Sequence, residues 1–321
     1  MSYINNIDSE KKGKINLTKS DWYFKKIQSK LKSRLGIKCK KDNFGGRQYY
    51  FPDVVIDKMC RMLESGIPFS VGRMGMVELN WLIEEEQKDD LGKVLFSRKY
   101  DDDWSSVEKN RRQFVEITRD AYKDIDILAN WYNCSLEEDI LIRKYTKKSL
   151  ISTDTMIINS FMQNKPWTKY LQGKKVLVIS PFVDEIKQQY MVREKLFDNP
   201  NILPEFELKI YKGIWIQDYI EKYRCAYRDV YNKYLEDIFQ IDFDVALISC
   251  SAPSFALASE IKKKGRTGIQ MGGALQILFG IKGKRWDEMN EINCLYNEHW
   301  IRPGNNNRPR NAEVLDGCCY W

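Results

Sequence analysis

The sequence predicts an α/β protein in which a mostly parallel sheet is flanked by helices on both faces. Short apolar runs alternate with stretches of helical spacing from Lys174 onward, a pattern typical of parallel strands joined by crossover helices. The chain has 321 residues, of which 43% are hydrophobic and 13% aromatic, enough to bury a sizeable core. We expect a basic arm over residues 1–50 and a single domain over residues 51–321.

The N-terminal arm is basic and amphipathic. Residues 1–50 contain 13 Lys and Arg against 4 Asp and Glu, a net charge of +9, whereas the whole chain carries +7. In "DWYFKKIQSKLKSRLG" the apolar residues fall on one helical face and the cations lie off it. We favour a helix docked on the body of the protein, with contact to an anionic membrane surface as the alternative. We expect no nucleic-acid partner, because the rest of the chain has no net positive charge.

Cysteine and histidine usage points to an intracellular protein. The eight cysteines form no CxxC pair, and His299 is the only histidine, so neither a zinc site nor a redox dithiol is expected. We expect reduced, mostly buried thiols. No apolar run approaches the roughly 18–20 residues that cross a bilayer, and the first residues lack the apolar centre of a signal peptide. The expected location is therefore cytoplasmic, peripheral at the inner membrane face.

The first part of the domain is predicted to be largely helical. A helix from about Val54 to Glu64 leads through a Ser-Gly turn into the strand "IPFSVGR". Residues 76–150 consist of helical stretches and polar connections, and we expect them to form a helical insertion. The acidic cluster at residues 101–103 is expected to cap the helix that follows it.

The second part contains the alternating pattern. Four apolar runs are predicted as strands, namely "KKVLVISPF", "FELKIYKGI", "FDVALISCSAP" and "GRTGIQMGG". Helices are predicted between them in "DEIKQQYMVREKLF", "IEKYRCAYRDVYNKYLEDIF" and "PSFALASEIKKKG". The last residues, "GCCYW", end an irregular tail in aromatic side chains, and we expect this tail to pack back on the body.

Ligands of open parallel sheets bind beyond the carboxyl ends of the strands, and the end of "GRTGIQM" has features of a phosphate site. Gly272 and Gly273 let the backbone approach a ligand, and the short helix after them offers free N–H groups to an anion. The segment beyond adds three cations and an aromatic ring that could stack on a base or sugar: Lys282, Lys284, Arg285 and Trp286. A tight structural turn is the alternative. Neither GxGxxG nor GxxxxGK[ST] is present, which argues against a dinucleotide fingerprint and a P-loop.

The stretch "FSVGRMGMVELNWL" places a cation and a carboxylate where a strand gives way to a helix. Arg73 and Glu78 could form a structural ion pair. Alternatively, Arg73 meets a phosphate while Glu78 serves a metal ion, a sugar hydroxyl or a proton. Gly72 and Gly75 make room for either arrangement.

Two further polar groups follow later strands. Ser251 belongs to the "CSAPS" strand end, but a single histidine in the chain makes a serine triad an unlikely arrangement to find. His299 lies with Arg302 in "NEHWIRP". It could be a general base, although we favour a partly buried residue that is hydrogen-bonded to the backbone.

Several of these motifs together resemble the glycosyltransferases of the GT-D fold, in particular the branch met in bacterial capsule and surface-polysaccharide loci. The resemblance is patchy over residues 65–150 and nearly continuous from about 174 to 321, with "GGALQILFGIKGKRWD" and the closing "CYW" as its most specific pieces. It implies a Rossmann-like sheet that binds a nucleotide sugar. The family's Arg-x-Gly-Asp-x-Glu segment holds a divalent metal, and Arg73, Gly75 and Glu78 match it, whereas Met76 replaces the aspartate. Because a thioether is a poor ligand for Mn²⁺ or Mg²⁺, metal dependence is in doubt.

The resemblance and the chemistry of sugar transfer assign provisional roles. Lys282, Arg285 and Arg302 are the candidates for stabilising the departing phosphate. Glu78 would bind the donor, through a metal if one is present, or act as a base. The remaining contacts to the donor are expected from residues at the strand ends: Ser180, Pro181, Gly272, Gly273 and Gln276.

The expected function is therefore transfer of a hexose from a nucleotide diphosphate sugar, most simply a UDP-sugar, to a growing, lipid-linked glycan. A catalytically silent subunit that binds a nucleotide sugar or glycan within a transferase complex is the first alternative, because Met76 departs from the family pattern. An unrelated phosphate-binding α/β enzyme is the second.

Overall fold

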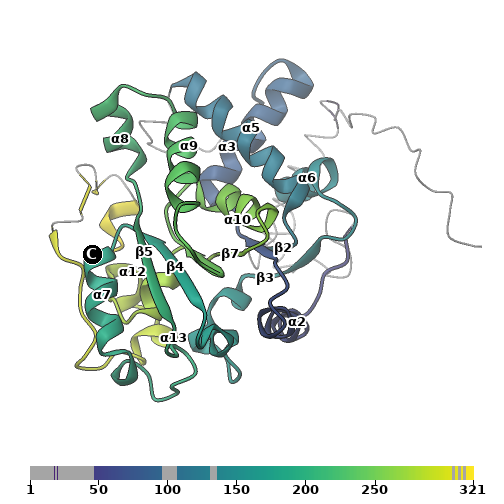
Figure 1. Cartoon of the computed structure of the whole chain (residues 1–321). Coiled ribbons are helices and arrows are strands. Elements are labelled where there is room, and N and C mark those ends of the chain that lie inside the picture. Colours follow the sequence, from purple (N-terminus) through teal and green to yellow (C-terminus); the bar gives the residue numbers. More distant parts are fainter. Residues whose placement is uncertain are drawn as a thin grey trace, which may run out of the picture.

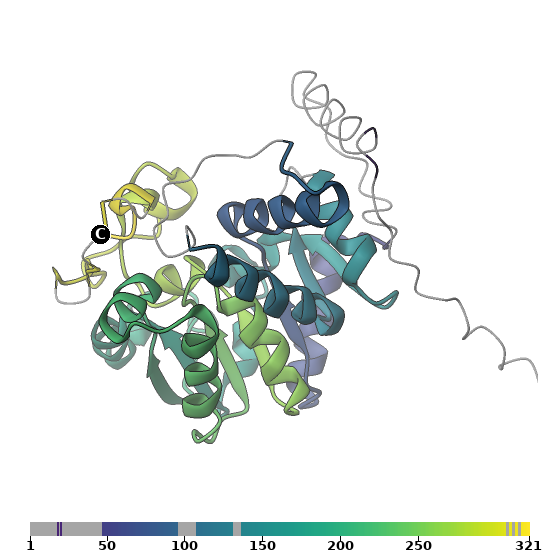
Figure 2. The same cartoon turned by 90° about the horizontal axis from the view of Figure 1, so that it is seen from above.

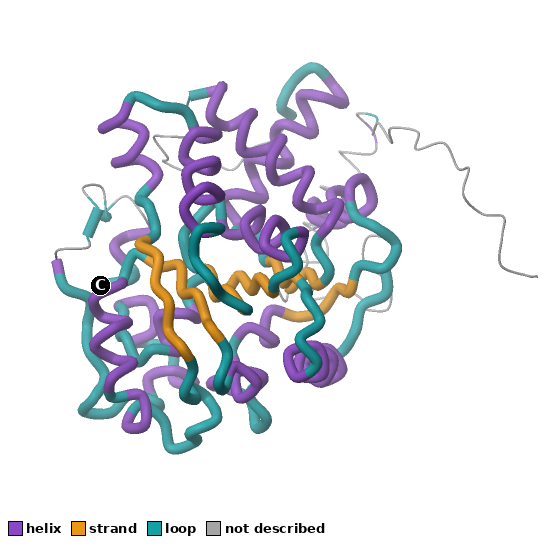
Figure 3. Tube along the Cα trace, viewed as in Figure 1, coloured by secondary structure: helices purple, strands orange, loops and turns teal. Residues whose placement is uncertain are grey.

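The computed structural model describes residues 47–95, 107–130, 136–305, 308–309, 312–313 and 316–321, together with residues 18 and 20. Its centre is a seven-stranded sheet in the order β3-β2-β1-β7-β6-β4-β5, with every pairing parallel. Figure 3 shows these strands as a layer with helices on both sides. The predicted fold class, a Rossmann-like α/β fold with a parallel sheet, is confirmed.

Five of the seven strands were expected from their apolar runs. They are β1 (Ser70–Gly72), β4 (Lys175–Ser180), β5 (Glu207–Lys212), β6 (Val245–Ile248) and β7 (Thr267–Gln270). The four that lie inside the sheet are almost wholly buried, whereas the edge strand β5 is half-buried. Their burial explains why the runs are continuously apolar instead of alternating.

The other two strands correct the expected helical insertion over residues 76–150. Strand β2 (Ile127–Asn130) lies inside that range, and β3 (Ile151–Asp154) follows directly after it. Val71 of β1 lies in register with Ile127, so this region builds one half of the sheet. The sequence signal was weak because β2 starts three residues after a long amphipathic helix and β3, "ISTD", is mostly polar.

The helices connect the strands and cover the sheet. Those in the first half are α2 (Pro52–Glu64), α3 (Met76–Leu91), α5 (Glu108–Asp124) and α6 (Leu136–Tyr145). Those in the second half are α7 (Val183–Met191), α8 (Ile216–Tyr223), α9 (Tyr227–Ile238), α10 (Ser254–Lys263), α11 (Ala274–Leu278), α12 (Lys284–Asp287) and α13 (Asn290–Asn293). The single helix expected in "IEKYRCAYRDVYNKYLEDIF" is two, because Arg224 adopts a left-handed backbone at φ 49°.

Two hydrophobic cores lie on opposite faces of the sheet. Alternate residues of β4 divide between them, with Leu177 and Ile179 in the first core and Val176 and Val178 in the second. The first core includes α3, α5, α6, α9 and α10, and the second includes α2, α7 and α11. Figure 1 shows α5, α6, α9 and α10 above the sheet and α2 and α13 below it.

The strand order creates a switch point between β1 and β7, which are hydrogen-bonded neighbours. The helix that follows β1, α3, packs in the first core, whereas the helix that follows β7, α11, packs in the second. Neighbouring strands therefore send their chains to opposite faces, which leaves their carboxyl ends accessible between two helix starts. Open parallel sheets bind ligands at such a point.

The C-terminal residues pack back on the body, as expected. The ring of Trp321 lies 5.5 Å from that of Phe182 and 6.0 Å from that of Trp215. In Figure 1 the C-terminal end lies next to α7 and α12, and Figure 2 shows this yellow segment beside the yellow-green stretch that follows β7. The basic helix of the arm and the acidic cluster at residues 101–103 lie outside the described residues.

Two expectations about the chain as a whole can be compared with the described residues. Within them, no helix is long and apolar enough to cross a membrane. Six cysteines are described, all as free thiols, but only Cys250 is buried and Cys294 is exposed. The expectation of mostly buried thiols is therefore wrong for this part of the chain.

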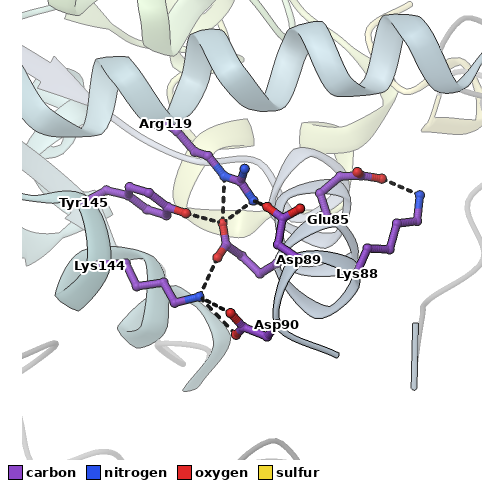
Figure 4. A network of polar contacts seen from close by, with 8 residues as sticks. Glu85, Lys88, Asp89, Asp90, Arg119, Lys144 and Tyr145 are labelled. Atoms are coloured by element: carbon purple, nitrogen blue, oxygen red, sulfur yellow. Dashed lines mark hydrogen bonds and ion pairs between the residues drawn. The ribbon is translucent and has the colours of Figure 1, made fainter. Parts of the chain in front are cut away.

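A network of buried charges joins the second half of α3 to α5 and α6 (Figure 4). The carboxylate of Glu86, 1% exposed, accepts hydrogen bonds from Arg119 at 2.7 Å, from Lys144 at 2.8 Å and from the Tyr145 hydroxyl at 2.7 Å. Lys144 also bridges to Asp90 at 3.0 Å. Opposite charges meet throughout this network, so it fixes three helices against one another.

Candidate functional site

The candidate site lies at the carboxyl ends of β1 and β7, where Arg73 and Glu78 follow one strand and Gly272 the other. The backbone N–H of Arg73 donates to the side-chain oxygen of Gln270 at 2.8 Å. Gln270 is the last residue of β7, so this bond ties the two chain segments together just beyond the sheet. Beyond this bond the chain after β1 continues to one face of the sheet and the chain after β7 continues to the other. The bond therefore fixes the position of the Arg73 backbone at the point where the two segments separate.

Arg73 is the centre of the site. A Cβ built on Gly272 would lie 3.8 Å from the guanidinium carbon of Arg73, so this side chain extends over the turn after β7. Desolvation lowers the pKa of Arg73, Tyr320 and Glu78 raise it, and Arg285 lowers it again. Glu78, Arg285 and Tyr320 therefore all lie within electrostatic range of Arg73, although they come from distant parts of the chain.

Glu78 is the third residue of α3, and its carboxylate folds back over the N-cap residue Gly75. A side chain at position 75 would collide with the Glu78 carboxylate, so steric exclusion explains why this position is a glycine. The carboxylate also lies in the first turn of the helix, where the free N–H groups favour negative charge. Met76 is the first residue of the same helix and is half-buried.

Tyr320 carries the C-terminal segment into the site. Its hydroxyl accepts a hydrogen bond from Arg285 at 3.3 Å, and the guanidinium carbon of Arg285 lies 4.8 Å from the centre of its ring. The backbone around it is fixed, because Lys284 donates to the carbonyl of Trp321 at 3.0 Å and Arg285 donates to that of Cys319 at 2.9 Å. Residues 319–321 therefore form one wall of the site with α12.

Gln276 holds this wall to the turn after β7. Its side-chain amide nitrogen donates to the carbonyls of Tyr320 at 2.8 Å and Lys282 at 3.0 Å. The residue was expected to contact the diphosphate or ribose. In the structure it is buried and its amide nitrogen supports the segments that present Tyr320 and Arg285.

Trp286 and two of the expected glycines are closely packed against neighbouring groups. The Trp286 ring is 5% exposed and packs so closely on Gly273 that an added Cβ would lie 2.8 Å from it. Gly72 meets the ring of Phe255 in the same way, at 2.5 Å. Close packing therefore explains why positions 72 and 273 are glycines. The buried Trp286 ring has no open face on which a base could stack.

Lys282 and Arg302, two of the three expected phosphate-binding cations, lie in a separate group. Arg302 donates to both carboxylate oxygens of Asp287, at 2.9 and 2.8 Å. The Lys282 ammonium lies 5.2 Å from the centre of the Tyr296 ring. Of the three cations, Arg285 is the one whose charge lowers the pKa of Arg73.

The other expected contacts are dispersed along the same edge of the sheet. Ser180 is buried and its hydroxyl accepts a hydrogen bond from the backbone of Phe182 at 3.2 Å, while Pro181 packs under Gly213. Ser251 is exposed at the end of β6 and has a left-handed backbone at φ 59°.

His299 lies apart from these strand ends, in the loop before the Ile281–Ile301 bridge. Its ring is 36% exposed, with the Nε2 nitrogen 3.5 Å from Glu298. The backbone bonding that we expected of the His299 side chain is not among its contacts; its main-chain carbonyl instead accepts from Gln189 at 3.0 Å.

The side chains present do not fit the divalent metal of the GT-D glycosyltransferases. Within the described residues, no group of three or more His, Cys, Asp and Glu side chains is arranged to hold a metal ion. Met76 stands at the aspartate position, and Glu78 is engaged near Arg73. A hard cation takes several oxygen ligands, and among the residues that the family pattern assigns to the metal only Glu78 is a carboxylate.

Sequence reasoning missed Tyr320 and Gln270. The closing "CYW" was expected to pack on the body and was part of the family resemblance, but no role in the site was predicted for Tyr320, and Gln270 is the last residue of a predicted strand. Nothing in the local sequence around position 320 indicates that it reaches a strand end some 250 residues earlier. A half-buried arginine at a strand end is the available signal, since such a group needs partners from elsewhere in the chain.

Comparison with known families supports the fold assignment. Residues 130–278 match the family model of the GT-D fold-like domain. Over these residues the chain is similar to GT-D fold-like domains. The matched range runs from the end of β2 through α11, so it includes the turn after β7 but neither Arg73 and Glu78 nor the C-terminal wall. Comparison with curated proteins and with solved structures gave no match.

Proposed function

We propose that this protein is a glycosyltransferase that moves a hexose from a nucleotide diphosphate sugar to a glycan acceptor. The observation that carries the proposal is the convergence of Arg73, Glu78 and Arg285 at the switch point of a GT-D-like sheet. A UDP-sugar is the donor that we favour. A lipid-linked surface polysaccharide at the cytoplasmic membrane face is the acceptor we favour, on the basis of the basic arm and the family resemblance.

The reaction needs charge stabilisation on one side of the sugar and a proton acceptor on the other. The bond from the anomeric carbon to the diphosphate oxygen breaks, and its electron pair leaves with the nucleoside diphosphate. The acceptor hydroxyl forms the new bond to that carbon and gives up its proton. Fixed cations that face the leaving group lower the barrier, and a carboxylate within reach of the hydroxyl acts as general base.

The residues of the site suit these two tasks. Arg73 and Arg285 offer planar guanidinium groups, which bind phosphate oxygens in pairs. Glu78 would accept the proton of the acceptor hydroxyl. The exposed Ser251 at the neighbouring strand end is positioned to line the same edge of the sheet.

Ligand preference tests the proposal directly. Thermal unfolding of the full chain would be measured with UDP-, GDP- and dTDP-hexoses, each with and without Mn²⁺, against UMP and inorganic phosphate. We expect a sugar nucleotide to raise the melting temperature more than either control, because only it occupies both the base and diphosphate contacts. Equal protection by free phosphate would instead favour an unrelated phosphate-binding enzyme.

A catalytically silent binding subunit is the second candidate, and Met76 is the observation that favours it. Such a subunit would bind the same sugar nucleotide in the thermal assay. It would release no nucleoside diphosphate from that donor with any glycan acceptor or with water. Detection of nucleoside diphosphate release above that of the Glu78→Gln variant would exclude it.

A further inference from the structure

We propose that Trp215 and Trp321 form an aromatic platform that binds a pyranose ring of the acceptor glycan. Trp215 lies three residues beyond the carboxyl end of β5, at the same edge of the sheet as the candidate donor site. In Figure 1, α8 rises from this end of β5, close to the C-terminal end of the chain. The inference deepens the proposed function and rests on it for the identity of the ligand as a sugar.

The two tryptophans of the platform differ in exposure from the others that the structure describes. Four described tryptophans are buried, with 5% exposure or less, namely Trp81, Trp167, Trp286 and Trp300. Trp215 and Trp321 are only half-buried. Burial of a large apolar ring is favourable. Two neighbouring rings that keep part of their surface in water therefore mark a place where a ligand can add burial.

The platform is held in place by contacts on several sides. The ring centres of Trp215 and Trp321 lie 6.0 Å apart, and Trp321 meets Phe182 in an edge-to-face contact at 5.5 Å. The indole N–H of Trp321 donates to the carbonyl of Gly304 at 3.3 Å, and its own carbonyl accepts from Lys284 at 3.0 Å. These contacts fix the Trp321 ring before a ligand binds, which lowers the entropy cost of binding.

Tyr320 joins the platform to the turn after β7. A Cβ built on Gly273 would lie 3.7 Å from the Tyr320 ring, and a Cβ built on Gly272 would lie 3.8 Å from the guanidinium carbon of Arg73. In the sheet order, β6 separates β7 from β4, and Ser251 is exposed at the end of β6. A ligand that starts at Arg73 can therefore reach the platform along one edge of the sheet.

The chemistry of the platform suits a sugar. A pyranose has faces made of C–H groups, which pack on aromatic rings, and hydroxyls around its edge, which need hydrogen-bond partners. Asp218 is half-buried in the first turn of α8, three residues after Trp215, so the two side chains are neighbours. No described residue forms a hydrogen bond or an ion pair with the Asp218 carboxylate. This carboxylate can therefore accept hydrogen bonds from sugar hydroxyls.

The geometry of the two rings favours a sugar over a nucleobase. A flat base held between two rings needs them about 7 Å apart, since each contact takes about 3.5 Å. The rings of Trp215 and Trp321 lie 6.0 Å apart and are inclined at 37°. A ligand must therefore lie on their exposed surface, which is bent at the angle between them. A puckered pyranose matches a bent surface better than a flat base does.

The test is saturation-transfer NMR of the full chain with the methyl glycosides of glucose, galactose, N-acetylglucosamine and rhamnose, and with UMP as the nucleobase probe. We expect at least one glycoside to bind, with saturation strongest at the C–H protons of one face. Trp215→Ala should weaken this binding about fivefold or more, and Trp215→Phe, which keeps a ring, should weaken it less. A UDP-hexose should raise the melting temperature of Trp215→Ala as much as that of the wild type.

A matched control and a second variant keep the result interpretable. Phe51 is 78% exposed and follows Tyr50, which is hydrogen-bonded to β3 at the opposite edge of the sheet. Phe51→Ala should bind the glycosides as the wild type does. If Trp215→Ala does not fold, Trp321→Leu keeps an apolar side chain against Phe182 but removes the platform ring. It should weaken glycoside binding by a similar factor.

The outcomes separate this inference from the proposed function. Absence of binding by all four glycosides, or wild-type affinity in both Trp215→Ala and Trp321→Leu, overturns the platform. Protection by a UDP-hexose would then still support the glycosyltransferase proposal. Loss of UMP binding in Trp215→Ala with glycoside binding retained assigns the rings to the base and also overturns the platform. Glycoside binding that depends on Trp215, without protection by any UDP-hexose, supports the platform and overturns the proposed donor.

Discussion

The two ends of α3 use charged residues in opposite ways. In its second half, Glu86 is surrounded by Arg119, Lys144 and Tyr145, so each buried charge has a partner of opposite sign (Figure 4). At its start, Glu78 acts on the pKa of Arg73, which a second arginine, Arg285, also influences with the opposite sign. In the first arrangement opposite charges meet in hydrogen-bonded ion pairs, whereas in the second two like charges influence each other at a strand switch point.

The difference teaches where to look for function on a helix rich in charges. A satisfied network locks helices together, and breaking it leaves uncompensated buried charge. An arrangement that keeps like charges close is costly for the protein alone and becomes favourable when a ligand of the opposite sign binds. Both ends of α3 contain carboxylates in first or last turns, so sequence pattern by itself does not distinguish them.

Replacing Glu78 should have the largest effect, and on activity alone. Glu78→Gln keeps the size of the side chain but removes the proton acceptor, and we expect sugar transfer to fall by about 10²–10⁴-fold. The free energy of unfolding should change little, because Glu78 is only half-buried. Transfer would be followed by release of nucleoside diphosphate, with Glu64→Gln on α2 as the matched control. Retention of wild-type turnover would remove Glu78 from the reaction.

Replacing Glu86 should have the opposite profile. Glu86→Ala leaves Arg119 and Lys144 without their shared carboxylate in a buried place, and we expect a loss of about 3–5 kcal/mol in the free energy of unfolding. Urea unfolding would measure it. UDP affinity of the folded fraction should stay the same, because the network lies away from the strand ends. A selective loss of UDP binding without destabilisation would contradict the division between the two ends of α3.

Glu138 provides a pH-dependent test of buried charge on α6. Burial raises the pKa of Glu138 from 4.5 to about 7, against a lowering by the Asn130 hydrogen bond. The folded state therefore holds a proton that the unfolded state releases above pH 4.5, so stability falls as pH rises from about 4.5 to about 7 and is then constant. Glu138→Gln should remove this dependence and be more stable than wild type at pH 8 by about 2–4 kcal/mol. Parallel pH–stability curves for the two proteins would contradict it.

The smallest effect is expected for an exposed ion pair on the neighbouring helix α5. Arg112 and Glu108 lie 2.8 Å apart, with 61% and 65% of their side chains exposed. We expect Arg112→Ala to cost no more than about 0.5 kcal/mol in the free energy of unfolding. Urea unfolding beside Glu86→Ala would show whether burial decides the strength of these pairs. If Arg112→Ala lowered the free energy of unfolding as much as Glu86→Ala does, solvent exposure would not be what makes the Arg112–Glu108 pair weak.

Much of the fold was predictable because buried parallel strands leave a strong local signal. The runs in β4 and β6 are continuously apolar and bounded by turns, so their type could be assigned without tertiary information. Strands β2 and β3 could not be assigned, since β2 closely follows a long amphipathic helix and β3 is mostly polar, so neither shows a distinct apolar run. Their partners in the sheet stabilise them, and those partners are distant in sequence.

The candidate site divides in the same way. Arg73 and Glu78 were predictable, because glycines and charges at a strand end mark a place where a backbone approaches a ligand. The sequence could not predict that Arg285, and not Lys282, lies near Arg73, since the two residues are three positions apart and equally cationic. The bonds from α12 to residues 319–321 direct Arg285 toward Tyr320 and Arg73, while Lys282 packs on Tyr296.

The sequence by itself determined the α/β class, the position of five strands and the charged residues that begin α3. Hydrophobic burial and turn chemistry act over a few residues, so these features are written locally. Only the tertiary structure decided which cation joins Arg73 and that Tyr320 completes the site. Those contacts close loops of some two hundred residues, and their geometry depends on how two faces of a sheet bring the chain back to one edge.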